Sequence, residues 1–561
     1  MRSDVTPPSV RWSLVTSTAT TVGGRPRMNF SWPIDGTIVG IYLLATMIAG
    51  LLVRKYVSRV EDFLVAGREM NVYLGIASLA ATEFGIITCM YTAQAGFTNG
   101  FAGALPGLCQ AVAMFLIGWT GFCVKPLRDS GAMTLPELFE KRFGKFVRWL
   151  AGVVIVFGGL LNMGVFLKIG GDFLCLVCGF DIKYLAAIMT VLLVMVAVYT
   201  ILGGMLSVLV TDFLQFVVMS IGLLVVTVMI LQQVGWEKLV ATVEQHHGAG
   251  GFNPLVNPNL GWTFLIMQIL GNTAATLTWQ TTIARLLAAK DTDTGRKVYT
   301  RTSFFFVCRW LIPGLWGIAA LAVIGWQPLK QLTVGELAKV PPAIQERISA
   351  SKPGQPLAQL SEIEAASLAP AVANKVNDAS LHAMPKFLST FLPVGLMGLL
   401  IAAMLAADMS TDSSYMLSWG SVIYNDILGP FRRRAWTDRR AILWNRCIVA
   451  LIGVYLLVFG LLYSIEGNVW SYLLLTGSIY LSSMSVLLVA CCYWRRANNW
   501  GALGAIILGA AVPIAHLSME KIPATAKLAA SLGKDAAGIA AFVAAALGMI
   551  AGSLLKPRRN S

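Results

Sequence analysis

Long apolar runs recur from one end of this 561-residue chain to the other, and they constrain its fold more than any other feature. A helix needs about 20 consecutive apolar residues to cross the hydrocarbon core of a bilayer. The composition agrees, because 56% of the residues are hydrophobic and only 13% are charged. The sequence therefore predicts an all-α polytopic membrane protein with thirteen spans, at about 34–53, 72–97, 101–124, 146–176, 184–202, 205–232, 261–284, 302–325, 388–424, 445–465, 469–493, 501–518 and 536–555.

The net charge of +15 is a topology signal rather than a sign of a nucleic-acid partner. With the N-terminus placed outside, most Lys and Arg residues fall in short inside segments, as the positive-inside rule requires. We therefore expect a cell (inner) membrane protein with a cytoplasmic C-terminus and an attraction to anionic lipid. Lys168 and Arg309 are exceptions within predicted spans. The inside segments are 54–68, 125–148, 285–301, 432–446, 495–496 and 556–559.

Three parts are expected: a flexible N-terminal tail at 1–33, a transmembrane transporter domain at 34–555 and a cytoplasmic tail at 556–561. Met28 is a plausible start, because the first apolar run follows it directly. The longest loop, 326–387, is expected outside, with a short helix near 357–377. It either caps the outer mouth or is a tolerated insertion. The functional unit is expected to be a monomer.

The stretch from Leu392 to Asp426 begins as a membrane helix and becomes polar at membrane depth. Its small residues, among them Gly398 and Ala403, allow a neighbouring helix to approach closely. The polar cluster at 408–414 is costly in lipid and must face protein or a water-filled cavity. Within it, one helix face presents hydroxyl groups beside a backbone carbonyl, and these oxygen atoms suit a hard cation as ligands. The alternative is that the hydroxyls only bond to carbonyls one turn back. This face consists of Ala407, Ser410, Thr411 and Ser414.

Cysteine and histidine do not form a metal-binding pattern. Cys175 and Cys178 have the spacing of a metal or redox pair, but no second pair or histidine cluster accompanies them. No nucleophile–base pair or phosphate-binding loop stands out either. The sequence therefore predicts neither an enzyme nor a cofactor.

Four stretches, in order, resemble motifs of the sodium:solute symporter family, which contains sodium-coupled sugar, proline, pantothenate and choline transporters. The likeness covers about 34–515. It implies a LeuT-like core of two inverted five-helix repeats, at about 72–232 and 261–493. The four stretches are Glu61–Arg68, Tyr199–Gln215, Arg285–Asp291 and Leu392–Asp426.

In such folds a broken helix presents free carbonyls and helix ends to ligands near the bilayer midplane. The second span contains Glu83 and Gly85 among polar neighbours at mid-depth, which fits an interruption. The seventh span is equally polar over 271–280.

The resemblance implies a sodium site made by the carbonyls of Ala81, Phe84 and Ala407 and the hydroxyls of Ser410 and Thr411. Some members have a second sodium site, whose pattern here is Asp212, Ser413 and Ser414, with Ser410 shared. Asp212 has a plainer alternative, which is to bond a neighbouring helix or Gln215.

Substrate residues follow from the same resemblance and from polar positions on core helices. Ala275 and Thr276 replace the aromatic pair that gates sugar in the sugar carriers, a departure that argues against a sugar. Arg309 either binds a substrate carboxylate or pairs with Asp408 or another acid. The candidate substrate residues are Glu83, Asn162, Asn272, Thr276, Trp279, Gln280, Arg309, Thr476 and Ser478.

We therefore expect a secondary active transporter that couples sodium entry to uptake of a small organic solute by alternating access. An organic acid or amino-acid-like solute is favoured over sugar. One alternative is proton coupling, with Glu83 or Asp212 carrying the proton. The other is a membrane sensor or receptor that keeps the fold without transport.

Overall fold

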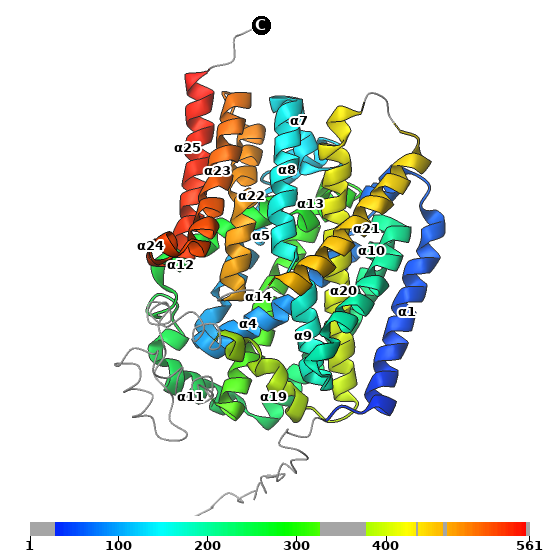
Figure 1. The fold of residues 1–561 in the computed structure, drawn as a ribbon, viewed down its shortest axis with the longest axis vertical. Coiled ribbons are helices and arrows are strands. Elements are labelled where there is room, and N and C mark those ends of the chain that lie inside the picture. The colour runs from blue at the N-terminus through cyan, green and yellow to red at the C-terminus, as the bar shows by residue number, and fades with distance from the viewer. Residues whose placement is uncertain (1–28, 326–376, 433–435, 464–467, 557–561) are drawn as a thin grey trace, which may run out of the picture.

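The computed structural model describes residues 29–325, 377–432, 436–463 and 468–556, and these are almost entirely helical. Most of the long helices run along one common direction (Figure 1). The helix expected near 357–377 lies outside the described residues except for its last residue, as do Met28, most of the N-terminal tail and nearly all of the C-terminal tail.

The membrane domain is built from long apolar helices joined by short ones. In chain order the helices that matter below are α1 (Thr37–Val53), α2 (Val60–Val65), α3 (Val72–Glu83), α4 (Ile86–Asn99), α5 (Leu105–Thr120), α6 (Val124–Asp129), α7 (Leu135–Phe143), α8 (Lys145–Met163), α9 (Phe166–Cys178), α10 (Leu185–Gln233), α11 (Trp236–His247), α12 (Gly261–Thr278), α13 (Gln280–Ala288), α14 (Thr292–Ile324), α19 (Ala383–Phe391), α20 (Leu396–Val422), α21 (Asp438–Leu462), α22 (Val469–Tyr493), α23 (Asn499–Lys521), α24 (Pro523–Leu532) and α25 (Lys534–Leu555).

Two of the predicted spans are broken near their middles, as expected. The second span ends as α3 at Glu83 and resumes as α4 at Ile86, with Phe84 and Gly85 out of helical geometry. The seventh span ends as α12 at Thr278 and resumes as α13 at Gln280, with Trp279 extended. Each break falls in the first span of one of the two expected five-span repeats, so the helix order agrees with that architecture.

Helix α10 contains the junction of the fifth and sixth predicted spans. The chain leaves helical geometry there at Gly204, whose φ is 55° and ψ −149°. A β-carbon at this position would lie 2.6 Å from the ring of Phe63 on α2, so only glycine fits both the backbone and the packing.

Helix boundaries differ from the prediction where capping decides them. Helix α14 begins ten residues before its predicted span, because Asp291 accepts a hydrogen bond from the Thr294 amide at 2.7 Å and caps the helix. Within the described residues, ten helical segments are long and apolar enough to cross a membrane. Several spans run together in these segments, so this count does not confirm the predicted thirteen.

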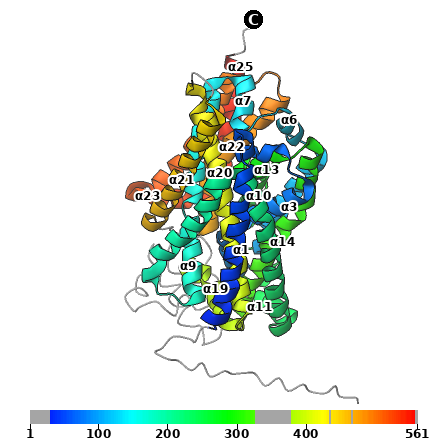
Figure 2. The ribbon, with the colours of Figure 1, turned by 90° about the vertical axis from the view of Figure 1, so that its right-hand side faces the viewer.

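Helix α20 is the centre of the fold, and all its residues from Leu400 to Gly420 are buried. Its small residues do admit close neighbours. A β-carbon on Gly222 of α10 would lie 2.4 Å from the β-carbon of Ala403, and one on Gly398 would lie 2.7 Å from the Asp35 backbone. Helix α1 covers this region from outside, against α10 and α20 (Figure 2).

Candidate functional site

The break between α3 and α4 lies directly against the polar face of α20. The Thr411 hydroxyl is 2.9 Å from the carbonyl oxygen of Thr82, in the last turn of α3, and 2.9 Å from that of Ala407, one turn earlier on α20. A β-carbon on Gly85 would lie 2.9 Å from the Thr411 hydroxyl oxygen, so glycine lets the two segments touch. The break therefore brings carbonyl oxygens of one helix to the hydroxyl groups of another.

The residues predicted to bind sodium are thus gathered in one buried region. Ser410 and Thr411 are 0% and 3% exposed, and Ala81, Phe84 and Ala407 are buried as well. The carbonyl oxygen of Ala81 accepts from the Phe84 amide at 3.3 Å, which closes the last turn of α3. The Thr82 carbonyl, which the sequence did not single out, is the α3 carbonyl that Thr411 contacts.

Asp212 lies beside this region and is paired with Arg285, a partner that the sequence analysis missed. The two side chains are both fully buried, and Arg285 Nη2 lies 3.0 Å from Asp212 Oδ2. We counted Arg285 with the basic inside loop. That placement is wrong, because Arg285 is in α13, within the membrane domain. No hydrogen bond joins Asp212 to Gln215 in the described part of the chain.

The Arg285 guanidinium also binds one hydroxyl group of the predicted second sodium site and two hydroxyl groups of α3. It donates to Ser414 Oγ at 2.5 Å, to Thr82 Oγ1 at 2.6 Å and to Ser78 Oγ at 3.0 Å. The Ser410 hydroxyl donates to Asp212 Oδ1 at 2.6 Å, which links the two predicted sodium sites. Ser413 instead donates to the Ser410 carbonyl at 3.1 Å. Asp212 and Ser414 therefore already hold a cation, the guanidinium.

A second group of polar side chains surrounds a small internal cavity of about 80 Å³ next to the break. Five predicted substrate residues line it: Glu83, Asn162, Asn272, Trp279 and Arg309. This is well below the roughly 300–1,000 Å³ of typical ligand pockets, so the cavity must widen to admit an organic solute.

Glu83 and Arg309 form an ion pair across this cavity. Arg309 Nη1 lies 3.6 Å from Glu83 Oε2, so the acid that pairs with Arg309 is Glu83 and not Asp408. The Thr281 and Thr282 hydroxyls of α13 donate to Glu83 Oε1 at 2.9 and 3.2 Å. The guanidinium of Arg309 also donates to Tyr91 Oη at 3.0 Å and to Gln110 Oε1 at 3.2 Å. Each charge is therefore balanced within the cavity wall.

Aromatic clusters stand at two sides of the cavity. Tyr91, Trp310 and Trp470 pack with ring centroids 4.9–5.5 Å apart near the start of α22. Trp279 packs on Tyr415 at 5.8 Å and on Tyr480 at 5.9 Å near the middle of α22. Most of these rings are buried, so the two clusters form packed parts of the domain on either side of the cavity.

The other four predicted substrate residues do not line the cavity. Thr276 donates to the Asn272 carbonyl, Gln280 to the Thr278 carbonyl and Ser478 to the Leu475 carbonyl. Thr476 accepts from the Asn162 amide at 3.1 Å and so positions a residue that does line it. Gln110 lines the cavity but was missed, although an isolated amide in the apolar run 101–124 was a usable signal. Tyr91, Phe166, Tyr415 and Trp470 were missed too, because sequence alone does not separate such rings from ordinary core.

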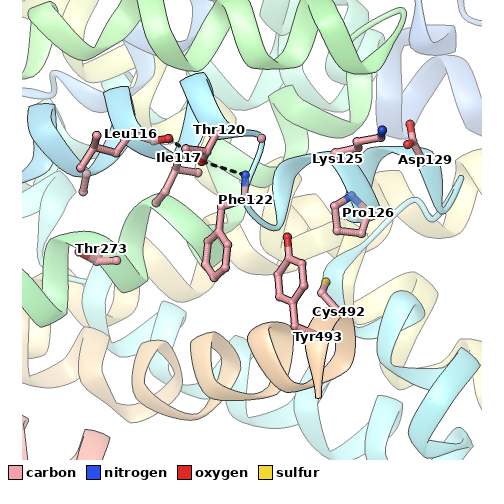
Figure 3. Close-up of a pocket in the computed structure, with 12 residues that line it drawn as sticks. Leu116, Ile117, Thr120, Phe122, Lys125, Pro126, Asp129, Thr273, Cys492 and Tyr493 are labelled. Atoms are coloured by element: carbon pink, nitrogen blue, oxygen red, sulfur yellow. Dashed lines mark hydrogen bonds between the residues drawn. The ribbon is translucent and has the colours of Figure 1, made fainter. Parts of the chain in front are cut away.

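A larger cavity of about 910 Å³ lies elsewhere, between α5, α6, α12 and α22 (Figure 3). Its lining is mainly apolar and includes Phe122 and Tyr493, whose rings stack at 5.0 Å. It contains none of the predicted sodium or substrate residues and is therefore separate from the site above.

Comparison with known proteins gives a family and a fold. The profile of the sodium:solute symporter family matches residues 63–344 and 354–509. Sodium/glucose cotransporter 4 of Mus musculus is 26% identical over 87% of this chain and 69% of its own length. Sodium/glucose cotransporter 1 of Oryctolagus cuniculus is 24% identical over 90% and 75%, and the sodium/myo-inositol cotransporter of Mus musculus is 24% identical over 85% and 66%.

Among solved structures, a Na⁺-coupled sialic acid symporter in a substrate-bound outward-open state superposes with a TM-score of 0.73. It is 17% identical and covers 94% of this chain and 99% of its own, so the fold is shared over nearly the whole length. Together with the motifs and the two broken helices, the profile match shows that this chain belongs to the sodium:solute symporter family and is a multi-pass membrane transporter rather than an enzyme.

Proposed function

We propose that this protein is a secondary active transporter in which sodium entering down its gradient carries a small organic solute by alternating access. The observation that carries the proposal is the contact between Thr411 and the broken second span. There, neutral hydroxyl and carbonyl oxygens meet at membrane depth, 2.9 Å apart. Hard cations prefer oxygen ligands, and ligands without full charge hold such an ion loosely enough to release it.

The proposed sodium ligands are the carbonyls of Ala81, Phe84 and Ala407 and the hydroxyls of Ser410 and Thr411. The Thr411 hydroxyl proton, which now points at a carbonyl, would turn away so that the oxygen can face the ion, whereas the Ser410 hydroxyl already donates to the Asp212 carboxylate. The Thr82 carbonyl is a further candidate, since the Thr411 hydroxyl already contacts it.

A second sodium at Asp212, Ser413 and Ser414 would have to share Asp212 with Arg285, which lies 3.0 Å from that carboxylate. The sodium Hill coefficient decides this point. A value near 2 that falls toward 1 in Asp212→Asn would support a second site, whereas a value near 1 in the unaltered protein would assign Asp212 to the ion pair alone.

Coupling to sodium makes strong accumulation possible. One sodium ion crossing about 100 mV gains ~2.3 kcal/mol. A tenfold concentration ratio adds ~1.4 kcal/mol, and the total of ~3.7 kcal/mol corresponds to roughly 500-fold accumulation of solute. A second coupled ion would square this limit.

For the solute we propose a neutral polyhydroxylated molecule, a sugar or polyol, in place of the organic or amino acid that the sequence favoured. The names of the relatives point to glucose and myo-inositol. The cavity agrees, because Asn162, Asn272 and Gln110 provide amides while Trp279 provides an aromatic face. The charge of Arg309 is balanced by Glu83, so the cavity has no net charge to attract an acid.

Sodium is favoured over the proton as the coupling ion. Glu83 and Asp212, the acids that could carry a proton, are each engaged in an ion pair with a guanidinium, so a proton would have to replace that contact. We further propose that the protein works as a monomer in the cell (inner) membrane, with the N-terminus outside and the C-terminus in the cytoplasm. The basic residues are concentrated on the cytoplasmic side in this orientation.

Uptake into proteoliposomes tests this function. Radiolabelled hexoses, inositols and small carboxylates would be offered with an inward sodium gradient, with choline replacing sodium, and with a proton gradient alone. We expect accumulation of a sugar or polyol with sodium only. Uptake driven by protons alone would contradict the sodium assignment, and solute binding without any uptake would indicate a sensor.

A further inference from the structure

The large cavity between α5, α6, α12 and α22 opens on the surface of the domain, beside exposed apolar side chains of α5. One stripe of α5 exposes large apolar side chains along its length, from Leu108 (54% exposed) to Leu116 (48%) and Trp119 (63%). Leu116 also lines the cavity, together with Ile117 and Phe122 (Figure 3). A hydrocarbon chain lying on this stripe can therefore enter the cavity without crossing a polar barrier.

The rim of the cavity carries a small excess of positive charge, because Lys125 and the nearby Arg296 face one carboxylate, Asp129. Lys125, on α6, is exposed and makes no ion pair with any described residue. Asp129, one turn further on, accepts from the Thr292 hydroxyl and forms no ion pair with Lys125 among the described contacts (Figure 3). The Arg296 guanidinium lies close to Gly121 at the same rim and donates to the backbone carbonyls of Gly118 and Trp119, which leave its charge unneutralised.

We propose that this cavity binds one anionic membrane phospholipid, with the phosphate at Lys125 and Arg296 and an acyl chain along Leu116 and Phe122. The volume of about 910 Å³ is in the range of ligand pockets, about 300–1,000 Å³. Basic pockets between membrane helices on the side rich in Lys and Arg are suited to such headgroups. A neutral lipid lacks the net charge that Lys125 and Arg296 would bind.

The site lies next to the solute pathway without belonging to it. Thr273 of α12 lines the large cavity, whereas its neighbours in sequence, Gly271 and Asn272, line the internal cavity. A bound lipid would therefore pack against the helix that carries a proposed substrate residue. The proposal does not depend on which solute is transported.

Cysteine labelling tests the site locally, because the Cys492 side chain lines the same cavity (Figure 3). The protein would be placed in nanodiscs of neutral phosphatidylcholine, with or without phosphatidylglycerol, and labelled with N-ethylmaleimide. Mass spectrometry of peptides would give the rate at each cysteine. Cys447, which is exposed on α21, is the internal control.

We expect phosphatidylglycerol to slow labelling of Cys492 several-fold and to leave Cys447 unchanged. Lys125→Gln should abolish this protection, whereas Lys145→Gln, the same change at an exposed lysine at the start of α8, should keep it. Equal Cys492 rates in both lipids, or protection that survives Lys125→Gln, would overturn the proposal. Protection by inorganic phosphate in neutral nanodiscs would overturn it too, since that result would show an anion site without a lipid.

Discussion

Replacing Thr411 with alanine removes one proposed sodium ligand, from a side chain that also lines the internal cavity. The Thr411 hydroxyl lies 2.9 Å from the carbonyl oxygens of Thr82 and Ala407, and both carbonyls are themselves candidates for the ion or its immediate surroundings. Alanine suits a helix and introduces no bulk, so Thr411→Ala should fold and reach the membrane normally.

The expected loss follows from the chemistry of one ligand. Losing an interaction of hydrogen-bond strength in a buried site costs about 1–3 kcal/mol. That cost corresponds to a decrease of roughly 5- to 150-fold in sodium affinity. Because sodium and solute binding are linked, the apparent solute affinity at low sodium should fall as well, and high sodium should restore it.

The assay is solute uptake against sodium concentration in proteoliposomes, at matched protein density. Thr411→Ser keeps the hydroxyl and should keep most of the sodium affinity. Ser421→Ala removes a hydroxyl from the same helix that only donates to the Ser418 carbonyl at 2.7 Å, and it should behave like the unaltered protein. Unchanged sodium dependence in Thr411→Ala, or equal losses in Thr411→Ala and Ser421→Ala, would refute the assignment.

Three further results are expected. Arg285→Ala should destabilise the detergent-solubilised protein by about 3–5 kcal/mol, because it leaves the Asp212 carboxylate buried and unpaired. The double change Arg285→Ala with Asp212→Ala should destabilise it less. Equal losses in the melting temperatures of the two variants would mean that the unpaired charge is not the cause. Arg309→Met should raise the half-saturating solute concentration at least several-fold, while its melting temperature should fall less than that of Arg285→Ala. Unchanged uptake kinetics would mean that the solute binds elsewhere. Burial lowers the pKa of His247, in α11, to about 4, so the folded state prefers the neutral ring. The melting temperature should therefore fall as the pH decreases from about 6.5, the pKa of an unfolded histidine, toward 4. Melting curves over this pH range should show a smaller fall for His247→Gln.

The sequence by itself determined the features that depend on neighbouring residues. Polar residues and a glycine at membrane depth located the break at Phe84 and Gly85, because unpaired backbone is tolerated there only when it faces protein or water. Helical periodicity placed Ala407, Ser410 and Thr411 on one face, and the structure brings that face against the break. The predicted bounds 184–202 and 205–232 placed a junction between two spans, and the structure shows that Gly204 makes it with a backbone conformation that other residues avoid.

Only the tertiary structure decided which partners meet across the chain. Arg285 follows an apolar run and precedes a basic loop, so local composition assigned it to the cytoplasmic side. Asp212, 73 residues earlier, is what stabilises its charge inside the membrane domain. Likewise, Arg309 had several possible acids, and packing of α14 against the broken span selected Glu83. A buried charge is stable only beside its counter-charge, and helix packing rather than local pattern sets that distance.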